Sequence, residues 1–279
     1  MALSYEESGD GDDGGGGDTS GSWVDLGSGG FASTADAIEL VGDGSAVYVA
    51  YADRNANNRI AVMSHDGSDT GSWNSAGDYV TPNAAYWDEV DIVVSGGNLY
   101  AAYAYADDGG NDPRLFVKRY DGSGWSAVGS TDGVPYNDGQ EWYVFGSHPQ
   151  LIGDGTTLTM VYRTDSLGLI GSYSYSGSGE TWDDADNEYW GVTGNEIASS
   201  EIALDSDSAN RPIAALGTGE MNAPEVELFR YESGGWAAHG PAFVPVGGAT
   251  WLDILALVLV GDTPYVALDT ADSSGYQVV

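Results

Sequence analysis

Short segments that alternate apolar and polar residues recur along the chain, separated by clusters of Gly, Asp, Asn and Ser. Residues 47–53 (VYVAYAD) and 99–107 (LYAAYAYAD) are examples, and a second apolar segment ending in a Gly/Asp turn precedes each. Alternation with a period of two indicates strands, and the Gly/Asp punctuation indicates hairpin turns. Since no segment keeps a helical period over eleven residues, the pattern predicts an all-β fold.

Five tryptophans stand in one local context and mark a repeat. They are Trp23, Trp73, Trp125, Trp182 and Trp236, at spacings of 50, 52, 57 and 54 residues. Each unit has a strand, a Gly/Asp turn, a second strand, a polar loop, a third strand, a turn and a fourth strand at the Trp. Four antiparallel strands repeated radially form a propeller blade, whereas solenoid repeats are usually shorter. The sequence predicts a five-bladed β-propeller with four antiparallel strands per blade.

The last unit supplies its first two strands, at 252–260 and 264–269. The strands it lacks have counterparts at the start of the chain: one at about 2–8 and one at Trp23, separated by a Gly/Asp-rich insertion at about 9–20. We therefore expect residues 1–279 to form a single domain. The N-terminal strand should complete the C-terminal blade and close the ring, which removes an open sheet edge. Both 2–8 and 276–279 match the same strand of the repeat, so their division of that strand stays open.

The repeat unit resembles a known type. YVAY, a polar Asp/Asn loop, YDG and a following Trp resemble repeats of bacterial surface propellers, and HDGSDTGSW resembles a loose Asp-box. The architecture is similar to that of five-bladed lectins of the tachylectin type. The resemblance spans about 260 residues and implies a fold rather than an activity; the fourth unit departs most, with PIAALGTG in place of YVAY.

Charge narrows the range of partners. The chain has 43 acidic and 8 basic residues, a formal net charge of −35. Such a field repels nucleic acid and anionic membranes, so neither is an expected partner. The most apolar run, 252–260, is about half as long as a membrane span. The start of the chain lacks the basic and apolar regions of a signal peptide, and the chain has no Cys. We expect an extracellular or particle-surface location, and the missing signal favours a particle component.

The five repeat tryptophans are best interpreted as structural, because a large ring at the same place in every blade packs between sheets. In the same way, Asp66 and Asp121 are expected to cap the turn before the fourth strand.

The other four tryptophans lie between one blade and the next, and most have a carboxylate nearby. The candidate ligand-binding residues are Trp87, Trp142, Trp190, Trp251, Asp88, Glu141, Glu188 and Asp253. Aromatic rings stack on the C–H face of a sugar while carboxylates accept its hydroxyl protons, so this set predicts a sugar-binding rim. The alternative is that these rings fill gaps between blades and the acids only solvate the rim.

Metal and enzyme chemistry have weaker signals. Asp53, Asn55 and Asn57 match the start of a calcium loop, without its sixth-position Gly and final Glu. Ordinary Asp/Asn turn chemistry is the favoured explanation of these residues, and calcium is the one cofactor considered. Carboxylates in or beside the first strands, at Glu39, Asp91, Glu201 and Asp253, do not share one register by spacing. We find no Ser/His/Asp triad.

The sequence favours a non-enzymatic, surface-exposed binding or structural module, with lectin-like carbohydrate binding as its leading version. Its expected partner is a glycan or a protein on the propeller face. Two alternatives remain: a glycosidase-type hydrolase with carboxylates at the central channel, and a purely structural subunit of a surface layer, filament or virus particle.

Overall fold

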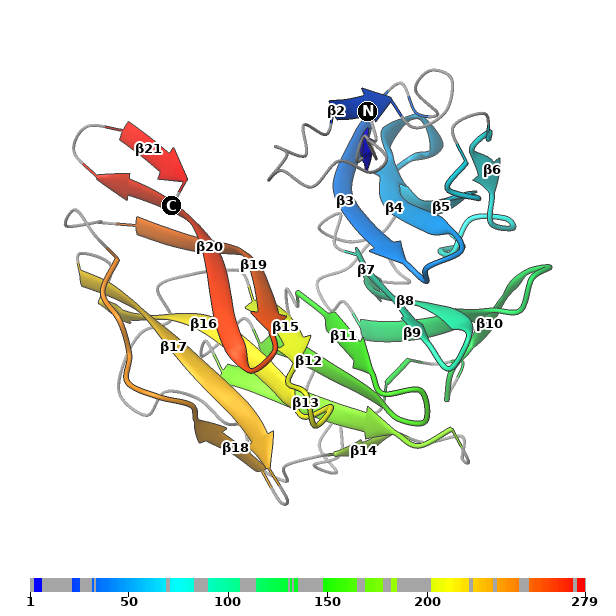
Figure 1. Cartoon of the computed structure of the whole chain (residues 1–279). Helices are drawn as coiled ribbons and strands as arrows, with labels where there is room; N and C mark the ends of the chain where they lie inside the picture. Colours follow the sequence, from blue (N-terminus) through cyan, green and yellow to red (C-terminus); the bar gives the residue numbers. More distant parts are fainter. Residues whose placement is uncertain are drawn as a thin grey trace, which may run out of the picture.

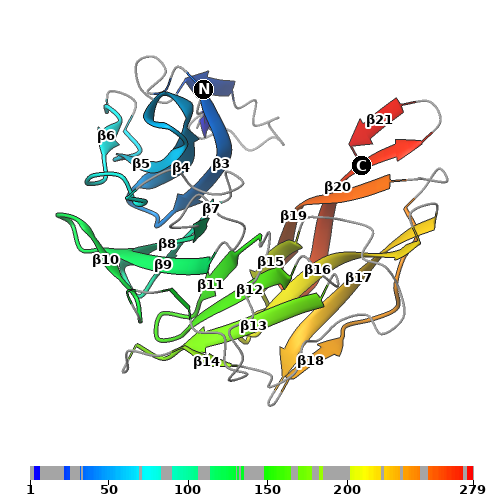
Figure 2. The same ribbon diagram turned by 180° about the vertical axis from the view of Figure 1, so that it is seen from behind.

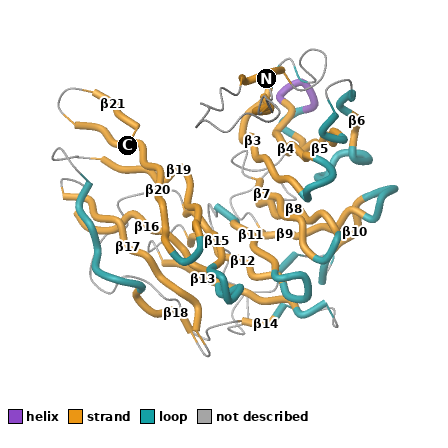
Figure 3. The backbone as a smooth tube through the Cα atoms, viewed as in Figure 1, coloured by secondary structure: helices purple, strands orange, loops and turns teal. Residues whose placement is uncertain are grey.

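The structure is a computed structural model of the chain. The residues that it describes are 3–6, 22–25, 32, 34–68, 71–82, 90–105, 114–129, 131, 133–134, 148–164, 169–177, 182–184, 202–220, 223–232, 235–245, 251–272 and 275–278. Strands dominate this backbone (Figure 3), and the helical segment η1 (Arg54–Ala56) is a single 3₁₀ turn. The fold is all-β, as the sequence predicts. No helix in the described ranges is long and apolar enough to cross a membrane.

Four antiparallel sheets of four strands follow one another along the chain. The first contains β3 (Ala35–Gly42), β4 (Val47–Asp53), β5 (Arg59–His65) and β6 (Asn74–Ser75). The second contains β7 (Val90–Ser95), β8 (Asn98–Tyr105), β9 (Arg114–Tyr120) and β10 (Trp125–Ala127). The third contains β11 (Gln150–Gly153), β12 (Leu158–Thr164), β13 (Leu169–Tyr175) and β14 (Asp183–Asp184). The fourth contains β15 (Ile202–Ser206), β16 (Pro212–Glu220), β17 (Ala223–Glu232) and β18 (Gly235–Ala238).

The chain ends form two smaller sheets. A fifth sheet has three strands, β19 (Trp251–Val260), β20 (Thr263–Asp272) and β21 (Gly275–Val278). At the other end β1 (Leu3–Glu6) and β2 (Ser22–Asp25) pair only with each other among the described strand pairs. The five-blade ring closed by the N-terminal strand therefore stays a prediction.

The sheets are arranged as blades around a common centre (Figures 1 and 2). Their first strands lie on the inner side of an arc and contact in sequence: β3 with β7, β7 with β11, β11 with β15 and β15 with β19. Because strands within each sheet are antiparallel, the turns joining first to second and third to fourth strands share one end of every blade. The connections to the next blade lie at the opposite end.

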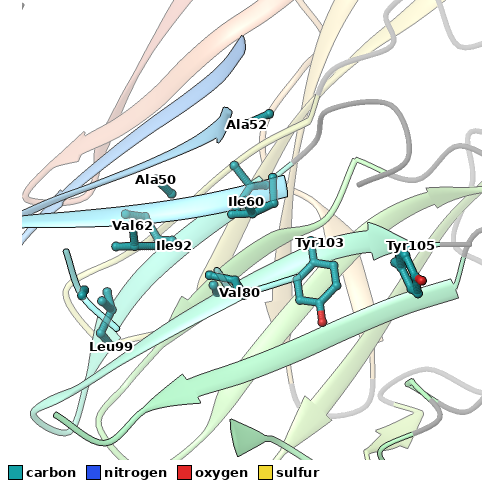
Figure 4. Packing of buried hydrophobic residues seen from close by; sticks show 12 residues of the cluster. Ala50, Ala52, Ile60, Val62, Val80, Ile92, Leu99, Tyr103 and Tyr105 are labelled. Atoms are coloured by element: carbon teal, nitrogen blue, oxygen red, sulfur yellow. The ribbon is translucent and has the colours of Figure 1, made fainter. Parts of the chain in front are cut away.

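Apolar side chains from neighbouring sheets interlock to form the core. Figure 4 shows the cluster between the first two sheets, where Ile60 and Val62 of β5 lie near Ile92 of β7 and Tyr103 of β8. These four side chains are at most 5% exposed. Such interlocking of blade faces accounts for the period-two pattern of the sequence.

Three of the five repeat tryptophans, Trp125, Trp182 and Trp236, have the structural role expected of them. The indole Nε1 of Trp125 donates to the Ala76 carbonyl in the first sheet (2.8 Å), and that of Trp182 donates to the Val128 carbonyl in the second (3.0 Å). The indole of Trp236 donates to Ser172 Oγ in the third sheet (3.0 Å). Each ring thus ties its own blade to the preceding one.

The predicted turn caps are also confirmed. Asp121 Oδ1 accepts bonds from the Ser123 and Gly124 amides at 2.9 Å each, and Asp66 Oδ1 accepts one from the Ser68 amide at 3.0 Å. Hydrogen bonds from Ser123 hold the pKa of Asp121 below its ordinary value, and bonds from Ser68 do the same for Asp66. These carboxylates stabilise the short turns of the repeat.

Candidate functional site

A pocket opens between the third and fourth sheets, with a volume of about 320 Å³. This lies within the range of small-molecule sites, about 300–1,000 Å³. It sits at the end of the blades that carries the hairpin turns. Its lining comes from six strands and two turns: Ile152, Gly153, Asp154, Thr157, Thr159, Ser174, Ser206, Asn210, Arg211, Pro212, Tyr231 and Glu232.

The pocket exists because Thr159 breaks the repeat. Thr159 in β12 pairs with Ile152 in β11. The equivalent residues of the first and second sheets are Tyr48, paired with Val41, and Tyr100, paired with Val93. Both Tyr rings pack against the apolar cluster that joins their sheet to the next. A threonine at this position leaves out the ring, and its place between the sheets becomes a cavity.

Arg211 is held at the pocket by a salt bridge with Asp207. Its Nε and Nη2 lie 2.7 and 2.6 Å from Asp207 Oδ2, and the Asp207 side chain is 2% exposed. Burial raises the pKa of Asp207, but hydrogen bonds from the Arg211 side chain and from the Arg211 and Ala209 amides outweigh it, so this pKa stays below its ordinary value. A guanidinium has five N–H donors, and this pair uses two nitrogens, so donors remain for a ligand.

Tyr231 and Glu232, at the end of β17, complete the lining. The Tyr231 ring packs edge-on against Trp236, with centroids 5.5 Å apart. Glu232 accepts from the Nη2 of Arg230 at 2.5 Å, and this bond lowers the pKa of Glu232. The site therefore combines an aromatic ring, an ionised carboxylate, a guanidinium and several hydroxyls. This set suits a ligand with apolar C–H faces and many hydroxyl groups.

The rim predicted from the sequence falls mostly outside the described residues: Trp87, Trp142, Trp190, Asp88, Glu141 and Glu188 all do. Trp251 and Asp253 lie in β19, where Asp253 pairs with Asp269 of β20. Trp251 opens β19 and so lies at the blade end opposite the hairpin turns. Trp251 and the pocket are therefore at opposite ends of the blades.

The predicted calcium loop forms a tight turn. Asp53 Oδ1 accepts from the Asn55 amide at 2.9 Å as the N-cap of η1, and Asp53 Oδ2 accepts from the Tyr79 hydroxyl at 2.9 Å. Asn57 ends the turn with a φ of 60°. In the described part of the chain, no three His, Cys, Asp or Glu side chains gather as a metal site. Both Asp53 oxygens thus have protein partners, which fits the turn interpretation.

Two of the first-strand carboxylates hold equivalent positions of the repeat. Glu39 pairs with Ala50, and Asp91 pairs with the equivalent Ala102. Asp253 pairs with Asp269, where the equivalent partner would be Ala267, so these acids do not all share one register. An irregularity between Asp36 and Glu39 in β3 shifts the spacing that leads to Glu39. Glu201 lies outside the described residues.

Asp91 is buried between the second and third sheets. Its carboxylate accepts the Leu151 amide of β11 and, at 2.8 Å, the Ile92 amide. Burial, together with a smaller contribution from the nearby charge of Glu39, raises the pKa of Asp91 to about 8. Since both oxygens bind backbone, Asp91 joins two blades rather than facing a substrate.

Sequence reasoning did not find the pocket, although the sequence holds its signal. That signal is LTMVYRT in the third unit, where Thr159 stands in place of the Tyr of VYVAYAD. Arg211 and Glu232 could not be associated from spacing, because only the pairing of β16 with β17 brings these two ends together.

No protein-family model matches the chain, and no curated protein matches its sequence. Solved structures do match its fold. An ulvan lyase of a polysaccharide lyase family, solved with a bound uronate–rhamnose sulfate saccharide, has a TM-score of 0.58 at 10% identity; the match covers 86% of this chain and 66%, just under two thirds, of the lyase.

Two further neighbours are similar in fold. The Aleuria aurantia fucose-specific lectin has a TM-score of 0.52 at 16% identity, with 85% of this chain and 71% of the lectin covered. The Penicillium chrysogenum α-L-arabinanase has a TM-score of 0.57 at 9% identity, with 88% and 77% covered. At these identities the likeness concerns the fold. The chain is an all-β protein of antiparallel four-stranded sheets, similar to propeller-type carbohydrate-active proteins.

Proposed function

We propose that this protein is a non-enzymatic carbohydrate-binding module and that it holds its ligand in the pocket between the third and fourth sheets. The observation that carries the proposal is the pocket itself. A cavity lined by one aromatic ring and several polar side chains stands where the first and second sheets have a packed tyrosine. Structural neighbours that bind a saccharide or fucose share the fold, which is compatible with this use.

The ligand class follows from charge. The lining has two carboxylates, Asp154 and Glu232, and one cation, Arg211, whose charge is paired with Asp207. The whole chain carries −35. A sulfated or uronic sugar would meet this field as a like charge, whereas a neutral sugar offers hydroxyls to both carboxylates and guanidinium. The proposed ligand is a neutral sugar with a C–H face that contacts Tyr231.

We place this site on a five-bladed ring exposed at a cell or particle surface, where a glycan partner is accessible. The tryptophan rim predicted from the sequence, of Trp87, Trp142, Trp190 and Trp251, is the second candidate surface; Trp251 lies at the blade end opposite the pocket. The hydrolase alternative would need free carboxylates at the channel, and Asp91 is engaged with two backbone amides.

A glycan array tests the proposal, with wild type compared with Thr159→Tyr. The variant restores the residue that the first, second and fifth sheets have at this position, so the fold should tolerate it while the ring fills the cavity. Thr131→Tyr, at an exposed turn, is the matched control.

We expect wild type and the control to bind a group of neutral glycans and Thr159→Tyr to lose them. Equal binding by all three proteins would move the site to the rim. Release of shortened glycans during incubation would favour the hydrolase, and the absence of any bound glycan would contradict the proposal.

A further inference from the structure

The strands that form each blade interface follow one rule of alternation. In β7, Val90 and Ile92 face back to the first sheet, where they join its cluster, while Val93 packs toward the third. In the same way Leu257 of β19 packs with Ala203 of the fourth sheet. Odd and even positions of the first strand thus serve the preceding and the following blade in turn.

At each end of the arc, this alternation leaves one set of side chains with no neighbouring sheet to pack against. Ile38 and Leu40 of β3 are 63% exposed each, on the face turned away from the second sheet. In the fifth sheet Val258, Val260 and Tyr265 are 53%, 66% and 56% exposed, on the face turned away from the fourth. These are five of the seven exposed large hydrophobics among the described residues. Their repeat positions are the ones that pack between blades elsewhere.

The fifth sheet lacks part of the strand that would lie beside β20. β17 pairs along the whole of β16, from Ala223 opposite Glu220 to Arg230 opposite Ile213. In the fifth sheet β21 pairs only with the last four residues of β20, from Asp269 to Asp272. No described strand borders residues 263–268 of β20 on that side.

β1 pairs as the end of the third strand of a blade does. Tyr5 of β1 pairs with Trp23, as Tyr120 pairs with Trp125 and Tyr231 with Trp236. β1 therefore corresponds to the end of β17, and β21 corresponds to its beginning. Laid on β20 in the register of the fourth sheet, Ser4 comes opposite Tyr265.

We infer that the outer face of β3 and the outer face of β19–β20 pack against each other as a fifth blade interface, with β21 and β1 forming two halves of one strand beside β20. The occupant of each apolar face is the other end of the same chain. This inference concerns assembly of the ring and does not depend on the proposed ligand. It accounts for two exposed faces of matching chemistry, which a soluble protein rarely leaves uncovered.

The absence of cysteine from the chain makes a cross-linking test clean. In the formed interface between the second and third sheets, Asp91 contacts the Leu151 amide. Ala256 of the fifth sheet holds the repeat position of Asp91, and Leu40 of the first sheet holds that of Leu151. The pair Leu40→Cys and Ala256→Cys should therefore bring two thiols together. Both residues are exposed in the arc, so the substitutions leave the existing blades intact. A short bismaleimide is the probe, and each single-Cys variant is a control.

We expect most of the double variant to form an intramolecular link, independent of protein concentration and mapped by mass spectrometry of the cleaved product. Deleting residues 1–9 from the double variant should lower the yield, because β1 supplies half of the missing strand. Dimers without the internal link would show that the faces pair between copies and would overturn the inference. Two singly modified thiols without a link, in a protein with an unchanged circular dichroism spectrum, would overturn it as well.

Discussion

Asp91 should make the stability of this protein depend on pH in an unusual direction. Its pKa is raised from 3.8 to about 8 in the folded chain, chiefly by burial, with Glu39 adding to the effect. Between these two values the folded state binds a proton that the unfolded state releases. The contribution of Asp91 is therefore fully present below about pH 4 and is lost as the pH rises toward 8. Asp91→Asn removes this titration and keeps an oxygen to accept the Leu151 amide.

The size of the effect follows from the shift. From 3.8 to about 8, at about 1.4 kcal/mol per pH unit, the free energy of unfolding of wild type relative to Asp91→Asn falls by at most about 6 kcal/mol. Relaxation around the carboxylate and penetration of water make the expected loss smaller, on the order of 2–4 kcal/mol. Glu39→Gln should reduce the loss, because it removes the neighbouring charge.

Urea unfolding followed by tryptophan fluorescence measures this difference from pH 4.5 to 8.5 at constant high NaCl. Every other titrating group is common to both proteins, so its contribution cancels in the difference between wild type and Asp91→Asn. A difference that stays flat over this range would contradict a raised pKa, since it would mean that Asp91 is ionised throughout.

Three further changes should have measurable effects on stability. Trp125→Phe removes the indole bond and leaves the buried Ala76 carbonyl without that donor; we expect a loss of about 1–3 kcal/mol in urea unfolding, and an unchanged midpoint would argue against the tie between blades. The charge of −35 should make the melting temperature rise from low to molar NaCl; CaCl2 at equal ionic strength should raise it more only if Asp loops bind calcium. Deleting residues 1–9 should lower the melting temperature and promote aggregation, and an identical melting curve would mean that β1 is a free arm.

Much of the fold could be predicted because it is local. Alternation in segments such as 47–53 and 99–107 specifies strands, and the Trp spacing specifies the repeat, since one indole per blade bonds to the blade before it. The turn roles of Asp66 and Asp121 follow from side-chain bonds to amides two or three residues away. The turn bonds involve near neighbours in sequence, whereas the indole bonds join residues 49 and 54 positions apart and are revealed by the regular spacing of the tryptophans.

The rest depends on relations between blades. A register irregularity beside Glu39 hid its equivalence to Asp91, because residue counting assumes unbroken pairing. The pocket arises where Thr159 faces the next sheet, and the effect of one small residue appears only when two sheets are packed together. The clustered tryptophans of the sequence indicated a rim between blades, whereas the aromatic ring of the pocket is that of a tyrosine, Tyr231.

A two-dimensional amide NMR titration of the labelled chain with a neutral glycan from the array tests most directly whether sugar is held between the third and fourth sheets. We expect shifts at the amides of Gly153, Thr159 and Arg211, and no such shifts for Thr159→Tyr. Shifts confined to indole N–H signals that vanish in Trp87→Ala or Trp251→Ala would contradict it and place the ligand at the opposite end of the blades.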